Sequence, residues 1–181
     1  LEKILRQVLI YMFFSKKQHD VVCIGDTTID VFLRLIEAHE VKKEIGSEIC
    51  MPFGEKIPYE SLELIPAVGN ASNVAVGCAR LGFKVAMVAG VGDDDFGKQI
   101  LSAYDKEGVD RSMVTITAKT PTNYHVVLNF GPERTILIKH NAFVYTPIKN
   151  IGKTSWIYLS SVAESAFNLH NEVVEYLIKN P

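Results

Sequence analysis

The sequence predicts an α/β domain built around a mostly parallel β-sheet. Residues 21–24 and 84–89 are short segments dominated by apolar residues, and each is followed by glycine, as expected of buried parallel strands. Residues 70–81 and 96–107 carry apolar side chains at helical spacing, and a glycine follows each segment as a helix stop. Because strand-like and helix-like segments alternate, we expect the strands to lie parallel in one sheet.

The pattern changes in the second half of the chain, where β-forming residues dominate. Residues 123–130 and 134–140 are joined by Gly-Pro-Glu and predict a β-hairpin. Four further segments are assigned in outline: an extended stretch at residues 30–35, short strands and loops at 38–60, a strand at 155–159 and an amphipathic helix at 169–179.

Composition and charge exclude several classes of function. The chain has 181 residues, of which 48% are hydrophobic, and a net charge of -2. It carries no basic field of the kind that nucleic-acid binding requires, so we expect no nucleic-acid partner. Cys23, Cys50 and Cys78 are odd in number and far apart, which favours reduced thiols in a cytoplasmic protein over disulfides or a metal site.

Residues 1–19 are interpreted as an N-terminal extension or leader helix. Their apolar run, residues 8–14, is too short to span a membrane, so no membrane partner is expected. Met12 is a candidate natural start, and Pro181 follows directly on a helix-like run. We therefore expect that both ends are cut from a longer protein.

The stretch GDDDFGKQ, residues 92–99, resembles a phosphate-binding loop but lacks two of its features. Gln99 stands where the magnesium-binding Ser or Thr belongs, and Asp93–Asp95 would surround a polyphosphate with like charges. Short acidic residues at this place favour capping of the helix that starts near Phe96. The dinucleotide fingerprint fails too, because an aspartate replaces its third glycine.

A longer pattern around this loop resembles the first signature of the ribokinase (PfkB) family of carbohydrate and nucleoside kinases. The run GNASNVAVGCARLGFKVAMVAGVGDDDFG matches that family's spacing at Asn73, Gly82 and Gly92, whereas Val68 replaces the first glycine of its Gly-Gly pair. VVCIGDTTIDVF resembles the family's opening strand, and TNYHVVLNFGPERTILI resembles its later β segment. The resemblance covers roughly residues 20–181.

The resemblance implies a Rossmann-like, mostly parallel sheet with helices on both faces, together with a small β lid. The lid would be formed by segments of about 31–60 and 120–140, and it is the expected surface of a homodimer. The implied activity is phosphorylation of a hydroxyl of a sugar, sugar derivative or nucleoside, with ATP and Mg²⁺ as cofactors of the full-length enzyme. Which sugar or nucleoside is bound does not follow from the sequence.

The resemblance also implies a set of substrate-binding residues. Asp30 matches an acidic residue that binds sugar hydroxyls, which suits a carboxylate because it accepts several hydrogen bonds. Gly69 matches the second glycine of the pair, where a side chain would block the substrate. Asn70 and Asn73 match polar contacts at a helix start, with helix capping as an alternative role.

His125 and Arg134 complete the expected substrate-binding set. His125 matches a pocket-facing strand position, although a half-buried structural histidine is an equal alternative. Arg134 lies beside the hairpin turn, where it could meet an anionic group or stay solvated. No catalytic or metal-binding residue is assigned.

The family's catalytic base lies in a G-A-G-D-type motif that this chain lacks. No aspartate follows Asp110, and only Gly131 and Gly152 follow it as glycines. We therefore expect the chain to be the N-terminal, substrate-binding part of a kinase, without the C-terminal ATP-binding part and inactive by itself. The alternatives are a non-catalytic, ligand-binding or regulatory relative and, more remotely, a dinucleotide-binding oxidoreductase domain.

Overall fold

The structure, a computed structural model, describes residues 19–180 and contains a parallel four-stranded sheet, here sheet A. All three strand pairings in this sheet are parallel, so the expected parallel sheet is confirmed. In spatial order its strands are β10 (Thr154–Leu159), β1 (His19–Ile24), β6 (Val85–Gly92) and β7 (Asp110–Thr117). The expected extension at residues 1–19 lies, except for His19, outside the described residues.

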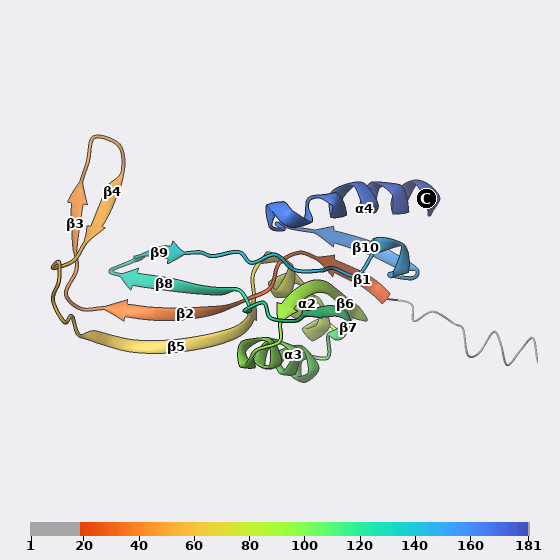
Figure 1. Cartoon of the computed structure of the whole chain (residues 1–181), viewed down its shortest axis with the longest axis horizontal. Coiled ribbons are helices and arrows are strands. Elements are labelled where there is room, and N and C mark those ends of the chain that lie inside the picture. Colours follow the sequence, from red (N-terminus) through yellow and green to blue (C-terminus); the bar gives the residue numbers. More distant parts are fainter. Residues whose placement is uncertain (1–18, 181) are drawn as a thin grey trace, which may run out of the picture.

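Helices cover both faces of sheet A, as the fold class required (Figure 1). Because side chains alternate along a strand, β1 and β6 serve two cores. Cys23 and Met87 pack with α2 and α3, whereas Val22 and Val88 pack on the opposite face with α4 and two short 3₁₀ helices. The helices are α2 (Asn70–Arg80), α3 (Asp95–Glu107), α4 (Asn168–Lys179), η1 (Ile148–Asn150) and η2 (Glu164–Ala166).

A second sheet, here sheet B, extends from this body as an arm (Figure 1). In spatial order it contains β5 (Tyr59–Val68), β2 (Thr28–Leu35), β8 (Tyr124–Phe130) and β9 (Glu133–Leu137), and a separate hairpin pairs β3 (His39–Lys42) with β4 (Ser47–Cys50). β8 and β9 form the predicted hairpin. Leu62 and Leu137 are about half exposed on this sheet. Its roles as a lid and as a dimer surface stay predictions.

Two strands have no counterpart in the sequence analysis, which assigned no element to residues 61–68 or 110–117. Both lie in edge strands, and these two strands bury too few side chains to show a continuous apolar run. In β7 only Met113 is buried. In β5 the strand contains Pro66, which edge strands tolerate because one side of their backbone needs no partner.

The GDDDFGKQ loop caps a helix, as its acidic residues predicted. Asp94 is the N-cap of α3, and its carboxylate accepts a hydrogen bond from the Gly97 N–H at 2.9 Å. The same carboxylate also accepts from the N–H and the hydroxyl of Thr122, at 2.9 and 2.6 Å. Partial burial raises the pKa of Asp94, but the bonds from Thr122 and Gly97 outweigh it and hold the pKa below its usual value. The loop thereby holds Thr122, which lies just before β8, in place.

Candidate functional site

The candidate site lies where the chain leaves sheet A and enters sheet B. β1 ends at Ile24, and residues 25–27 lead into β2. This turn is at the carboxyl end of a parallel strand, the edge at which open α/β sheets bind their ligands. Gly25 is required there, because a Cβ would lie 2.8 Å from the Cβ of Ala71 in α2. The turn and the start of β2 present two carboxylates, those of Asp26 and Asp30.

The structure brings together two of the expected substrate-binding residues, Asp30 and His125. They are register partners on the parallel strands β2 and β8. Asp30 Oδ1 and His125 Nδ1 lie 3.5 Å apart, and the side chains are 19% and 14% exposed. Asp30 Oδ1 and His125 Nε2 are buried without a hydrogen-bond partner. The pair is therefore close enough for electrostatic attraction but leaves bonding capacity free.

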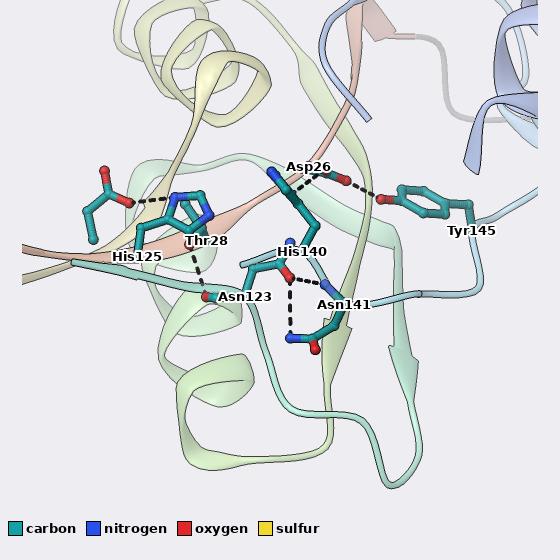
Figure 2. Close-up of polar contacts among 8 residues, drawn as sticks. Asp26, Thr28, Asn123, His125, His140, Asn141 and Tyr145 are labelled. Atoms are coloured by element: carbon teal, nitrogen blue, oxygen red, sulfur yellow. Dashed lines mark hydrogen bonds and ion pairs between the residues drawn. The ribbon is translucent and has the colours of Figure 1, made fainter. Parts of the chain in front are cut away.

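Asp26 forms a second carboxylate–imidazole pair beside the first. Its Oδ1 accepts a hydrogen bond from the Tyr145 hydroxyl, and its Oδ2 lies 3.3 Å from Nδ1 of His140 (Figure 2). The Asp26 side chain is 12% exposed, and its Oδ2 has no hydrogen-bond partner. Burial, together with the negative charge of Asp26, raises the pKa of Tyr145. The phenol therefore stays protonated and remains a donor.

The two pairs are in contact through their imidazole rings. The centroids of His125 and His140 are 5.6 Å apart, with the rings nearly perpendicular at 76°. Next to them lies Asn123, which is 1% exposed. Its Oδ1 accepts from the Asn141 N–H at 2.8 Å, whereas its Nδ2 is buried without a partner (Figure 2). The site thus contains unpaired acceptors and an unpaired donor.

The glycine and asparagines at the start of α2 are placed differently from one another. Gly69 has φ 104°, and a Cβ there would lie 3.1 Å from the backbone oxygen of Asp26. Gly69 is the N-cap of α2 without a side-chain capping bond, so the capping alternative for Asn70 and Asn73 is not realised. Both asparagines are exposed. Asn73 lines a groove together with residues of β5 and α3.

Arg134 is not brought to the Asp30–His125 pair. It is exposed in β9 opposite Asn129, which lies four residues beyond His125 in β8. At about 3.3 Å per residue, this places it roughly 13 Å further along the sheet. It lines a separate hollow of about 330 Å³ together with Glu40 and other residues near the β3–β4 hairpin.

Other features of the described chain do not compete with this site. A larger hollow of about 680 Å³, lined by Lys149, Lys153 and Glu172 among others, adjoins the amino end of β10 and so lies at the wrong edge of the sheet for a ligand of this fold. Within residues 19–180 no group of three or more His, Cys, Asp or Glu side chains is arranged to hold a metal ion. No helix in that range is long and apolar enough to cross a membrane.

Sequence reasoning missed Asp26, Asn123, His140 and Tyr145 as members of the site. Asp26 carried a usable signal, because it follows directly on Gly25 at the end of a buried strand. His140 and Tyr145 come from residues 138–147, which contain no regular element and therefore show no periodicity. Only the fold places them against Asp26.

Comparison with known proteins gives concordant results. The profile of the pfkB family carbohydrate kinases matches residues 18–175. The chain is similar to the 5-dehydro-2-deoxygluconokinase of Bacillus velezensis, at 30% identity over 106 residues that cover 59% of this chain and 27% of that protein. It is also similar to the ribokinase of Bacillus subtilis, at 36% identity over 87 residues that cover 48% of this chain and 29% of that protein. The matched parts therefore span under a third of these relatives.

Solved structures extend the likeness in fold. The ribokinase of Arabidopsis thaliana, solved in complex with ribose and ATP, superposes with a TM-score of 0.67 at 19% identity. The superposition covers 88% of this chain and 51% of that one. The chain thus spans about half the length of this structural neighbour, and at such low identity the likeness concerns the fold alone.

Proposed function

Because this chain belongs to the pfkB family of carbohydrate kinases, we propose that it is the substrate-binding portion of an ATP-dependent kinase that phosphorylates a hydroxyl of a sugar or nucleoside. The observation that carries the proposal is the Asp30–His125 pair at the ligand-binding edge of the fold. Buried polar atoms normally find partners, whereas Asp30 Oδ1 and His125 Nε2 have none. A ligand hydroxyl would supply one, since it both donates and accepts.

In this proposal Asp30 holds and orients the acceptor end of the substrate. A carboxylate can accept bonds from two neighbouring hydroxyls, and bonds to a charged acceptor are stronger than neutral ones. Gly69 keeps the backbone free of a side chain beside Asp26, and its positive φ of 104° is a conformation that other residues rarely adopt. In this role the residues bind and position the substrate, but they supply neither the phosphoryl group nor the catalytic base.

The phosphate-like loop of this chain does not fit ATP. The Gly97 N–H, which a phosphate loop would offer to the nucleotide, is bonded to Asp94. In the family, ATP with Mg²⁺ supplies the phosphoryl group. We assign that part, together with the base, to sequence outside these 181 residues, because no aspartate follows Asp110 here. The chain alone is therefore expected to bind substrate without turning it over.

Calorimetric titration of the chain with D-ribose, D-fructose, D-gluconate and adenosine tests the binding role. Asp30→Ala should lower the affinity for the tightest-binding of these ligands by roughly 10- to 150-fold, the equivalent of losing hydrogen bonds to a charged group. Glu63→Ala is the matched control, because it removes an exposed carboxylate from the neighbouring strand β5. Equal affinities for the two variants, or no binding of any ligand by the unmodified chain, would contradict the proposal.

Turnover is measured separately, with ATP, Mg²⁺ and the same ligands. The expected result is no product from the chain alone. Robust turnover would refute the assignment of the base to sequence outside it. Binding without turnover in a longer protein that carries a G-A-G-D-type motif would favour the non-catalytic, ligand-binding relative instead.

A further inference from the structure

Asp26 is a buried carboxylate whose surroundings leave one of its oxygens unsatisfied. The side chain is 12% exposed, and Oδ2 is buried without a hydrogen-bond partner. Removing a charged oxygen from water without replacing its hydrogen bonds is unfavourable, so native proteins keep few such atoms. Its occurrence at the ligand-binding edge of the sheet points to a ligand that completes the bonding.

The contacts of Asp26 fix the direction of this oxygen. Tyr145 donates to Oδ1, which holds the plane of the carboxylate, and the backbone N–H of Asp26 donates to the Ser161 carbonyl at 3.0 Å. His140 Nδ1 lies 3.3 Å from Oδ2 without meeting the geometry of a hydrogen bond. Oδ2 is therefore held in place and still able to accept.

The unpaired atoms around Asp26 form one group. Of five buried, unpartnered side-chain atoms among the described residues, four lie here: Asp26 Oδ2, Asp30 Oδ1, His125 Nε2 and Asn123 Nδ2. The carboxylate oxygens accept, the amide nitrogen donates, and the imidazole nitrogen does either according to its tautomer. Hydroxyl groups fit such a mixed set, because each one donates and accepts. An anionic group placed between Asp26 and Asp30 would instead be repelled by two negatively charged carboxylates.

We propose that Asp26 is a second ligand-binding carboxylate, and that a polyhydroxylated ligand bridges Asp26 and Asp30 through its hydroxyl groups. Tyr145 and His140 are positioning residues that hold the Asp26 carboxylate. This inference rests on the proposed function, because it places a second contact in the same site. A purely structural alternative is that Asp26 only anchors residues 140–145, and the test separates the two.

The test is calorimetric titration of the chain with D-ribose, D-fructose and D-gluconate, followed by the monodeoxy analogues of the tightest binder. Asp26→Asn keeps the shape of the side chain and an acceptor for Tyr145 but removes the charge. It should lower the affinity for the parent sugar by about tenfold or more. The same substitution should lower the affinity for the analogue that lacks the bridging hydroxyl by less than about twofold, because that analogue already lacks the contact with Asp26.

A structural anchor would give a different pattern. If Asp26→Asn lowers the melting temperature but leaves the ratio of parent to deoxy affinities unchanged for every analogue, the inference is wrong. Asp30→Ala in the same titrations shows whether the proposed function stands in that case. If no sugar binds the unmodified chain, both proposals fail.

Should Asp26→Asn not fold, Tyr145→Phe replaces it. This variant keeps the charge and removes only the bond that orients it. We expect it to weaken binding of the parent sugar by roughly threefold or more, the equivalent of one hydrogen bond, and to reduce the discrimination against the same deoxy analogue. Unchanged discrimination with Tyr145→Phe overturns the inference.

Discussion

Asp94→Ala should destabilise the protein by about 3 kcal/mol near neutral pH, because Asp94 serves α3 and β8 at once. Loss of an N-cap costs about 1 kcal/mol. The two bonds to Thr122 are lost as well, and since Thr122 is only 3% exposed, its N–H loses a partner at a cost of roughly 1–3 kcal/mol. For a chain of this length, about 3 kcal/mol corresponds to a melting temperature lower by roughly 6–12 °C.

The effect of Asp94→Ala should depend on pH in one direction. The pKa of Asp94 is lower in the folded protein than its ordinary value. Its stabilisation is therefore fully present above the ordinary carboxyl pKa of about 4, and it is lost as the pH falls through the lower, folded value. The gap in stability between the unmodified chain and Asp94→Ala should accordingly stay constant down to about pH 5 and shrink as the pH falls below about 4.

Thermal unfolding followed by far-ultraviolet circular dichroism measures both effects. Asp95→Ala is the control, because Asp95 belongs to the same acidic run but is 86% exposed and paired only with Lys98. Its melting temperature should fall far less. Equal shifts for Asp94→Ala and Asp95→Ala, or a gap that stays constant with pH, would refute the assignment of Asp94 as the anchor.

Two further predictions concern buried groups. Tyr104→Phe removes a buried hydroxyl that forms hydrogen bonds with Ser72 and Thr27, at 2.7 and 2.8 Å. The free energy of unfolding, measured with urea, should fall by about 1–2 kcal/mol. An unchanged value would mean that the hydroxyl cluster is energetically neutral. Burial, reinforced by a neighbouring cysteine, raises the pKa of Cys23 to about 12. Its thiol should therefore resist iodoacetamide in the native chain and react only in denaturant. Labelling of Cys23 in the native chain, detected by mass spectrometry, would contradict this.

The sequence predicts those parts of the fold that bury continuous apolar surface. β1, β6, α2 and α3 appear where apolar runs and helical spacing indicated them. β5 and β7 do not, because most of their residues are exposed or half-buried and show no clear apolar pattern. One local polar signal was also reliable, because Asp94 caps α3 as the acidic run indicated.

The candidate site was only half predictable, for a physical reason. Asp30 and His125 lie in segments whose resemblance to a known family assigns them a role, and the structure pairs them across β2 and β8. Asp26, His140 and Tyr145 meet through tertiary contacts between positions more than a hundred residues apart. No local pattern encodes such a meeting, because the irregular segment that carries two of them is ordered by what it touches.

The turn at residues 25–27 has a mechanical consequence. It joins β1 of sheet A to β2 of sheet B, so Asp26 lies in the connection between the sheets, whereas Asp30, four positions later, lies in sheet B. The distance between the two carboxylates therefore depends on the angle at which sheet B leaves the turn. A molecule that contacted both carboxylates would therefore link the turn to sheet B, and a substitution far out on the arm would alter affinity if it changed that angle.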